Sequence, residues 1–231
     1  MSAPSNPSRD EPESTPRAGA DPFAELRDTV HRLVWPEGCA WHAVQTHESL
    51  VPYLIEETAE FVDAVERGLP PEEVAGELGD VLYQVLFHAA IAERDGEGYD
   101  FAAVAAALNA KLIGRHPHVF GDRGYMSVEE LNAEWERLKE DAAGQRRGSR
   151  GALDGIPVGM PALARAAKVV ERLRRAGAPV PEPGAGGAAG SDERELGDAL
   201  LALVIRANAE GVDPDRALRL ATQRLAERHP S

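Results

Sequence analysis

The sequence has almost no cysteine and no long apolar run. Cys39 is the one cysteine among 231 residues, which excludes an intrachain disulfide and a cysteine-based zinc finger. A reducing cytoplasm is the simplest compartment for such a chain, so we expect a cytoplasmic protein. No apolar run approaches the roughly 18 residues that a membrane-spanning helix needs, so we expect no membrane partner.

Aromatic side chains are also scarce. They make up 5% of the sequence, and β-branched residues are sparse, which argues against an all-β fold. Hydrophobic residues reach 43%, which is enough to bury a core. Together these proportions favour an all-α fold.

Positively charged residues are fewer than negatively charged ones. The 25 Lys and Arg residues face 39 Asp and Glu residues, for a net charge of −14, which argues against a duplex nucleic acid as partner. The acid is concentrated between Glu48 and Asp80, where ten acidic residues meet one base, Arg67. Such a run is either a solvated face or a site for cations.

Residues typical of helix caps predict helices throughout the sequence. Thr46 and Asp100 suit helix N-caps, Gly68 suits a C-cap, and Ser127 with Glu130 has the spacing of a capping box. Residues 34–45 are expected to form a loop. The predicted helices span residues 23–33, 47–67, 71–94, 101–115, 127–143, 161–176, 192–210 and 214–228.

We expect two helical domains. Residues 1–22, rich in Pro and Ser, resemble a disordered tail. Residues 23–143 form a first helical domain, 144–158 a connector, and 159–231 a second repeat that contains a flexible Gly/Ala/Pro linker at 177–191.

The second domain repeats part of the first. Glu77-Leu78-Gly79-Asp80 recurs as Glu195-Leu196-Gly197-Asp198, and residues 111–117 recur in degraded form as residues 224–230. Two copies in the same order indicate a duplicated helical unit. The second copy has no counterpart of the acidic helix.

Two pairs of carboxylates carry the chemistry of the first repeat. Glu57 and Glu60 share one helix face, and so do Glu77 and Asp80 on the next helix. An antiparallel helix pair would bring the four together, and they would repel strongly without a cation between them. A hard divalent ion fits oxygen ligands, with Mg²⁺ as the first candidate and Mn²⁺ as an alternative. A solvated face remains the alternative for either pair alone.

Three further features are candidates for substrate binding or for the close approach of a ligand or another backbone. Lys111 and Arg115, four residues apart, are able to meet phosphate oxygens, or they are an exposed basic pair. Trp41 could stack on a base, although core or lid packing explains it equally well. Gly76 and Gly79 cost stability inside a helix, which close approach of another backbone or of a ligand would offset.

The motifs resemble those of the MazG nucleoside triphosphate pyrophosphohydrolases. The resemblance spans about residues 23–176 and continues, degraded, to His229. It rests on Gly38-Cys39-Ala40-Trp41, Gln45-Thr46-His47-Glu48-Ser49-Leu50, Pro52-Tyr53-Leu54, Glu56-Glu57-x-x-Glu60, Glu77-Leu78-Gly79-Asp80 and Arg115-His116-Pro117-His118-Val119-Phe120-Gly121-Asp122.

The resemblance implies an all-α helical bundle, with the second repeat as a degenerate copy. It implies Mg²⁺-dependent hydrolysis of nucleoside triphosphates between the α- and β-phosphates, giving a nucleoside monophosphate and pyrophosphate. It also implies a homodimer or higher homo-oligomer, with sites completed across subunits, and a role in clearing non-canonical nucleotides.

The resemblance assigns roles residue by residue. The metal-binding carboxylates are Glu57, Glu60, Glu77 and Asp80, and the phosphate-binding cations are Lys111 and Arg115. Glu56 completes the motif, and we expect it, or a metal ligand, to orient the attacking water as general base.

This chain departs from the family pattern in three places. His42 and Gly114 stand where the family usually has Asp and Arg, which affects the expected shape of the loop and the fit of the substrate. The second repeat keeps Glu195 and Asp198 without a Glu-Glu-x-x-Glu motif. We therefore expect the first repeat to be active and the second to be structural. The alternative function is a catalytically weak nucleotide-binding or partner-docking module.

Overall fold

The computed structural model describes residues 21–121, 124, 127, 130–131, 134, 151–182 and 192–228. These residues form helices and the turns between them, and none of them lies in a strand, which confirms the all-α expectation. The chain divides into two compact units, Met1–Tyr125 and Met126–Ser231. None of the described helices is long and apolar enough to cross a membrane.

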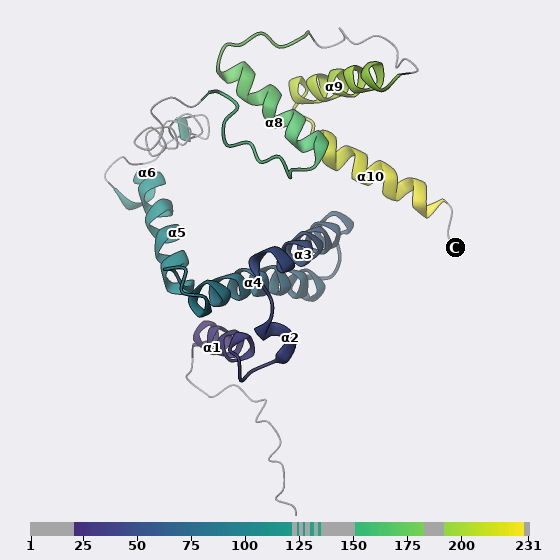
Figure 1. Ribbon diagram of the computed structural model, residues 1–231. Coiled ribbons are helices and arrows are strands. Elements are labelled where there is room, and N and C mark those ends of the chain that lie inside the picture. Colours follow the sequence, from purple (N-terminus) through teal and green to yellow (C-terminus); the bar gives the residue numbers. More distant parts are fainter. Residues whose placement is uncertain are drawn as a thin grey trace, which may run out of the picture. The chain divides into compact units, whose positions relative to one another are not determined.

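The first unit contains a long antiparallel helical hairpin, made by α3 and α4 (Figure 1). Gly68 ends α3 in a left-handed conformation with φ 66°, and Pro71 then begins α4. The helices among the unit's described residues are α1 (Pro22–Val34), α2 (Ala40–Ala43), α3 (His47–Arg67), α4 (Pro71–Arg94), α5 (Phe101–Arg115) and α6 (Pro117–Phe120).

The caps form as the sequence predicts. The Thr46 hydroxyl accepts from the Ser49 N–H, and the Ser49 hydroxyl accepts from the Thr46 N–H, which closes a capping box at the start of α3. The Asp100 carboxylate accepts from the Ala103 N–H at 2.7 Å. These side chains satisfy N–H groups that the first turn of a helix leaves without a partner.

The core of the first unit lies where α1, α3 and α4 meet. On α1 and α4 the buried residues recur at spacings of three and four, as an amphipathic pattern requires, and α3 contributes Leu50. Phe101, at the start of α5, packs against this cluster, and α5 itself has no fully buried residue. The buried cluster consists of Val30, Val34, Leu50, Leu86, Phe87, Ala90 and Ile91.

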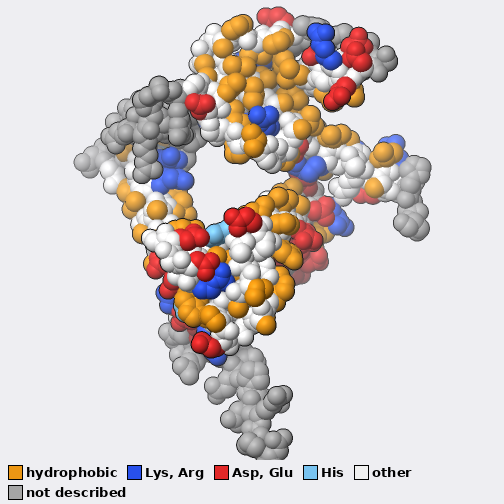
Figure 2. Space-filling model, in the orientation of Figure 1, with side chains coloured by type: hydrophobic (Ala, Val, Ile, Leu, Met, Phe, Trp, Pro, Cys, Tyr) orange, Lys and Arg blue, Asp and Glu red, His pale blue; other side chains and the backbone are white. Residues whose placement is uncertain are grey.

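The second unit has a smaller core. Its described helices are α8 (Ala162–Arg175), α9 (Glu193–Ala209) and α10 (Pro214–Glu227). The fully buried residues among them are Val170, Val204 and Ile205. Figure 2 shows many apolar side chains on the visible surface of this part of the chain.

Two parts of the sequence-based prediction need qualification. The expected loop at 34–45 contains the four-residue helix α2, and α6 follows α5 directly; a single helical turn has no periodicity to detect. The capping box of Ser127 and Glu130 forms, but most of the predicted helix 127–143 lies outside the described residues. So do most of the predicted tail 1–22, part of the connector 144–158 and part of the linker 177–191.

The place of Gly38 in the fold needs the absence of a side chain. A Cβ there would lie 1.9 Å from the carbonyl oxygen of Arg32, in the tight turn between α1 and α2. Apart from neighbouring residues of the same helix, no atom of the described chain lies within 4 Å of the Cβ position at Gly76 or Gly79. No other backbone of this chain approaches these two glycines, and approach of a ligand or of another chain's backbone stays a prediction.

We expect Gly38→Ala to destabilise the chain by more than about 1 kcal/mol, because the new Cβ must push the Arg32 carbonyl aside. Gly79→Ala is the matched control, and we expect it to stabilise the chain by about 1 kcal/mol, because alanine is the better helix former. Urea unfolding followed by circular dichroism measures both changes. Equal effects of the two variants would contradict the packing described at Gly38.

Candidate functional site

The α3–α4 hairpin brings the predicted metal ligands together. Carboxylate oxygens of Glu57, Glu60 and Glu77 all lie within 4.8 Å of one another. Asp80, one turn further along α4, is not part of that group, but its charge acts on Glu57. The antiparallel pairing expected from the sequence thus brings three of the four predicted ligands together, and the role of all four as metal ligands stays a prediction.

The electrostatics of this cluster suit a cation. Burial raises the pKa of the Glu57 carboxyl, and the negative charges of Asp80, Glu60 and Glu56 raise it further. A bound cation would favour the charged form of this carboxyl and oppose that rise. The donors are all carboxylate oxygens, which hard ions such as Mg²⁺ and Mn²⁺ prefer.

Glu56, the predicted general base, is exposed on α3 beside Glu57. It is not one of the three carboxylates that lie within 4.8 Å of one another. Its charge nevertheless raises the pKa of Glu57, so the two carboxylates interact. Glu56 thus lies beside the cluster without being part of it.

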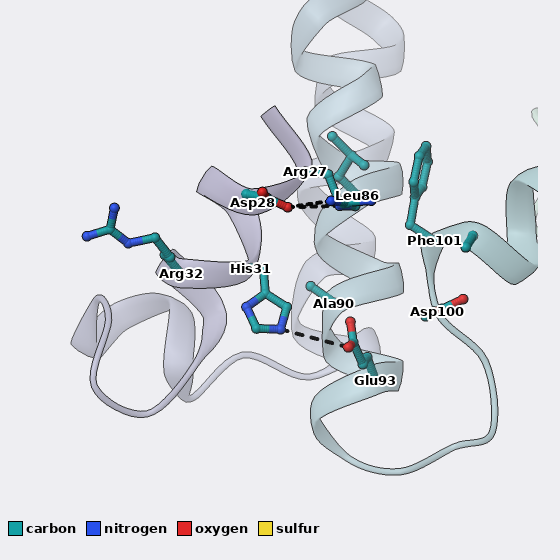
Figure 3. A pocket seen from close by; sticks show the side chains of 10 residues that line it. Arg27, Asp28, His31, Arg32, Leu86, Ala90, Glu93, Asp100 and Phe101 are labelled. Atoms are coloured by element: carbon teal, nitrogen blue, oxygen red, sulfur yellow. Dashed lines mark hydrogen bonds and ion pairs between the residues drawn. The ribbon is translucent and has the colours of Figure 1, made fainter. Parts of the chain in front are cut away.

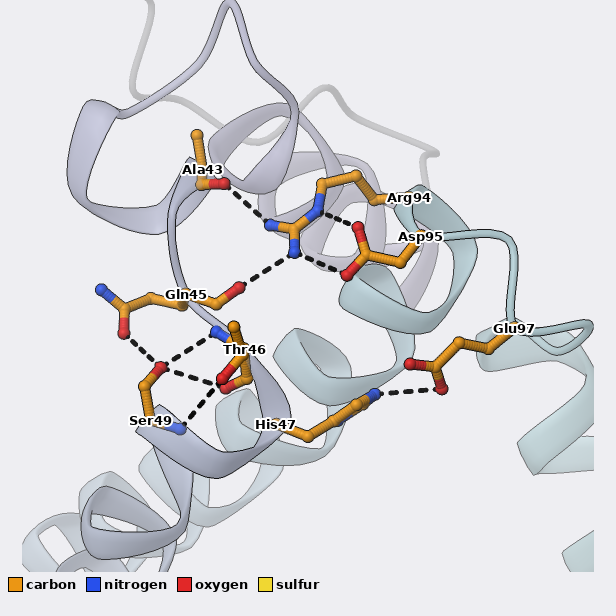
Figure 4. A network of polar contacts seen from close by, with 8 residues as sticks. All are labelled: Ala43, Gln45, Thr46, His47, Ser49, Arg94, Asp95 and Glu97. Carbon is orange, nitrogen blue, oxygen red and sulfur yellow. Dashed lines mark hydrogen bonds and ion pairs between the residues drawn. The ribbon is translucent and has the colours of Figure 1, made fainter.

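A network of polar contacts fixes the start of α3 against the end of α4 (Figure 4). The Arg94 guanidinium donates to the carbonyl oxygens of Ala43 and Gln45 at 3.0 and 2.9 Å. It also donates to both carboxylate oxygens of Asp95, and the bond to Asp95 raises the pKa of Arg94. The Gln45 side-chain amide in turn donates to the Trp41 carbonyl oxygen at 2.8 Å. One arginine therefore ties α2 and the connector before α3 to the end of α4.

Two histidines add a second link between the same helices. His47 Nδ1 and His88 Nδ1 lie 2.7 Å apart, and His47 Nε2 lies 3.2 Å from the Glu97 carboxylate. A carboxylate accepts only, so Nε2 of His47 carries a proton, and in the neutral ring Nδ1 accepts from His88. Burial, with a smaller effect of His47, lowers the pKa of His88.

An aromatic cluster lies next to the carboxylates. Trp41 and Tyr53 meet edge to face with ring centroids 5.8 Å apart, and both rings are partly exposed. His42 Nε2 and the Tyr83 hydroxyl form a hydrogen bond of 2.5 Å, and both of these rings contact Phe87. Trp41 and Tyr53, at 45% and 39% exposed, are thus accessible to a ligand.

Sequence reasoning found Trp41 but missed its aromatic partners. A signal was present in the spacing, because Tyr53 precedes Glu57 by four residues and Tyr83 follows Asp80 by three. In an antiparallel hairpin both steps lead toward the same end. Tyr53 therefore lies about one turn, or roughly 5 Å, from Glu57 along α3, and Tyr83 lies about one turn from Asp80 along α4.

The structure does not place the predicted phosphate-binding cations beside the carboxylates. Lys111 and Arg115 lie in the last two turns of α5. Figure 1 shows α5 leaving the far end of α4 and running away from the hairpin. The two halves of the predicted site thus lie on different helices that diverge within the first unit.

The second repeat has not kept a comparable cluster. Glu195 and Asp198 lie exposed on α9, with Asp198 at 4.0 Å from Arg194. Within the part of the chain that the structure describes, the group of Glu57, Glu60 and Glu77 is the one set of three or more ligating side chains close enough to share a metal ion.

A cavity of about 490 Å³ lies elsewhere in the first unit, between α1, α4 and the start of α5 (Figure 3). His31 points across it toward Glu93, with 3.8 Å between His31 Nε2 and the carboxylate. Arg27 pairs with its neighbour Asp28 at 2.7 Å. None of the predicted site residues lines this cavity, so it is separate from the carboxylate cluster.

Known proteins share this arrangement of motifs. The MazG nucleotide pyrophosphohydrolase domain matches residues 45–120, a range that includes the four carboxylates and both cations. A Thermotoga maritima protein named nucleoside triphosphate pyrophosphohydrolase/pyrophosphatase MazG is 38% identical over 220 residues, covering 89% of this chain and 83% of that protein. This chain belongs to the MazG family. The resemblance found in the motifs is confirmed.

Other similar proteins differ in their identity to this chain and in the share of each chain that the match covers. The Escherichia coli K12 nucleoside triphosphate pyrophosphohydrolase is 41% identical over 153 residues, covering 66% of this chain and 57% of that protein. A Streptomyces cacaoi protein, described as an uncharacterized 26.1 kDa protein in the blaB 3′ region, is 44% identical and covers 87% of this chain and 79% of its own length. The crystal structure of a mazG-related protein from Thermotoga maritima is 28% identical, with a TM-score of 0.45 over 51% of this chain and 98% of that one.

The burial of His42 predicts how the stability of this MazG family member depends on pH. Burial lowers the pKa of His42 below its usual 6.5, so the folded state binds fewer protons than the unfolded state as the pH falls through that value. The free energy of unfolding must then decrease on acidification. We expect His42→Gln to lose less stability than the wild type between about pH 7.5 and about pH 5.5.

Urea unfolding at the two pH values measures this difference. His118→Gln is the control, because it removes a histidine outside the aromatic cluster. If His42→Gln and the wild type lost the same stability on acidification, His42 would not be the group that is held neutral.

Proposed function

We propose that the chain is a Mg²⁺-dependent nucleoside triphosphate pyrophosphohydrolase. It hydrolyses the substrate between the α- and β-phosphates and releases a nucleoside monophosphate and pyrophosphate. The observation that supports this most strongly is the convergence of Glu57, Glu60 and Glu77 within 4.8 Å, in a chain whose relatives carry that activity in their names.

The carboxylate cluster supplies the ligands for the cofactor. Glu57, Glu60, Glu77 and Asp80 would hold Mg²⁺, or Mn²⁺ in its place. The bound ion would neutralise charge on the polyphosphate and lower the pKa of a coordinated water. The raised pKa of Glu57 supports this proposal, because its causes are burial of the carboxyl and the negative charges of Asp80, Glu60 and Glu56 near it.

The remaining residues position the reactants. Glu56, exposed beside Glu57, would accept the proton of the attacking water as general base. Trp41 would stack on the nucleobase, with Tyr53 beside it. Tyr53 lies about one helical turn before Glu57 on α3, which would keep the base close to the metal-bound polyphosphate.

Lys111 and Arg115 would bind the polyphosphate from a second copy of the chain. Their helix, α5, runs away from the carboxylates of its own chain, so each site would need the cations of another subunit. The active protein would be a homodimer or a higher homo-oligomer. Two cations facing a metal-bound triphosphate would stabilise the charge of the leaving pyrophosphate.

The cellular role would be cytoplasmic housecleaning of the nucleotide pool, and the first repeat would be the active one. The retained carboxylates of α9, Glu195 and Asp198, lie exposed without a second pair to complete them. Half a ligand set would hold Mg²⁺ poorly.

Pyrophosphate release from a panel of ribo- and deoxyribonucleoside triphosphates tests the activity. We expect product with Mg²⁺, a loss of at least about 100-fold for Glu60→Gln, because a metal ligand is removed, and unchanged turnover for Asp198→Ala. Glu60→Gln also relieves charge repulsion, so its unfolding temperature without metal should equal or exceed that of the wild type.

The outcomes separate the proposal from its alternative. If no triphosphate yields pyrophosphate above the level of Glu60→Gln, the chain is a nucleotide-binding or partner-docking module. If Asp198→Ala reduces turnover as much as Glu60→Gln does, the second repeat takes part in catalysis.

Mixing two inactive variants tests whether sites are shared. Glu60→Gln lacks a metal ligand and Lys111→Ala lacks a phosphate-binding cation, so a mixed dimer has one site with every residue intact. We expect the mixture to recover up to about one quarter of wild-type turnover, the share of intact sites after random exchange. A mixture as inactive as its components would place Lys111 and the carboxylates of one site in the same chain.

A further inference from the structure

Helix α2 is a single turn that carries the exposed Trp41 and the more buried His42. Its N-cap residue, Cys39, makes no side-chain hydrogen bond to the helix, and none of its four residues is fully buried. A helix this short gains little order from its own hydrogen bonds. The place of Trp41 therefore depends on the contacts that α2 makes with α3 and α4.

One of these contacts is a hydrogen bond between two side chains. His42 Nε2 and the Tyr83 hydroxyl lie 2.5 Å apart, and the His42 ring stacks on that of Phe87 with centroids 5.1 Å apart. Phe87 is fully buried in the core of the first unit, and Tyr83 packs against that core. The bond therefore joins α2 to a part of α4 that the core holds in place.

Neither partner has a replacement for this bond within the described chain. His42 Nδ1 is buried and has no hydrogen-bond partner among the described residues. Burial lowers the pKa of the His42 ring and raises the pKa of the Tyr83 hydroxyl, so both groups are neutral when they meet. Removing one of them leaves a polar atom of the other without its partner, which costs more than the bond itself contributes.

The Trp41 ring rests on the rings that this bond holds. It meets the His42 ring edge to face at 5.0 Å and lies 6.2 Å from that of Phe87. Its third ring contact is with Tyr53 of α3. The Gln45 side chain bonds the Trp41 carbonyl oxygen, which fixes the backbone of α2 but not the indole. The orientation of the indole thus depends on its three ring contacts.

We propose that His42 is a positioning residue for nucleotide binding. Its hydrogen bond to Tyr83 holds α2 on α4, and so holds the Trp41 ring where it stacks on the base of the substrate. This inference rests on the proposed function, because that function assigns the base to Trp41. Tyr83 follows the predicted metal ligand Asp80 by three residues on α4, so the bond links the base-binding turn to the helix that would hold the metal ion.

The positioning acts on the base and not on the polyphosphate. An interaction that holds the base equally well before and during the reaction lowers KM and leaves kcat unchanged. Loss of the His42 bond should therefore raise KM for a nucleoside triphosphate. Inorganic tripolyphosphate carries the same phosphate chain without a base, so its binding should not change.

Tyr83→Phe tests the bond, because it removes the hydroxyl and keeps the ring. In the full-length chain with Mg²⁺, we expect KM for nucleoside triphosphates to rise at least about fivefold, with kcat within about twofold of the wild type. Tyr99→Phe is the matched control, since Tyr99 lies outside the aromatic cluster, and we expect it to leave both constants unchanged.

Variants of His42 separate positioning from a purely structural role. Glutamine places a polar group near the position of Nε2, so His42→Gln should keep KM close to the wild-type value. His42→Leu removes the bond and should raise KM as Tyr83→Phe does. Combining His42→Leu with Tyr83→Phe should raise KM no further, because both changes remove the same interaction.

Calorimetry with α,β-methylene analogues of a panel of nucleoside triphosphates measures binding without turnover, and inorganic tripolyphosphate serves as the ligand without a base. The proposal is overturned if Tyr83→Phe binds the analogues as tightly as the wild type does, or if it loses affinity for tripolyphosphate to the same extent. It is also overturned if kcat falls while KM stays unchanged. If the analogues bind, Tyr83→Phe weakens them and no triphosphate is hydrolysed, the proposed hydrolysis fails and the role of His42 stands.

Discussion

The register of α3 against α4 is the constraint on which the carboxylate cluster depends. Its members come from two helices, so a shift of one residue along either helix would separate Glu57 and Glu60 from Glu77. Carboxylates repel one another, so the cluster itself cannot set the register. The contacts of Arg94 with the Ala43 and Gln45 carbonyls, and of His47 with His88, do so from the end of the hairpin.

The sequence predicts the parts of this structure that depend on neighbouring residues. The cap at Thr46 and the C-cap at Gly68 follow from local sequence and both form. The carboxylate pairs follow from spacings of three residues, and the hairpin brings Glu57, Glu60 and Glu77 together while Asp80 lies outside that group. The hydrogen bond between His42 and Tyr83 joins residues 41 positions apart, so no pattern of neighbouring residues predicts it. The divergence of α5 from the hairpin was equally unpredictable, because it depends on how Phe101 packs on the core.

The two repeats show how a duplicated helix can keep its packing and lose its chemistry. Leu86 with Phe87 in α4, and Val204 with Ile205 in α9, occupy the same buried positions. Apolar residues of different size preserve a core position, because burial requires only apolar character and about the right volume. A metal site instead needs specific ligands from two helices. The second repeat has no counterpart of the acidic helix, so it lacks half of those ligands.

The attachment of α5 by its first turn has a consequence for the working enzyme. A helix with no buried residue of its own gains little order from its own chain. If a second copy orders it, free subunits present Lys111 and Arg115 on a helix that packs on the core of its own chain through Phe101. Dilution would then lower the activity of each molecule, and the protein would have a threshold concentration below which it binds metal but does not turn over substrate.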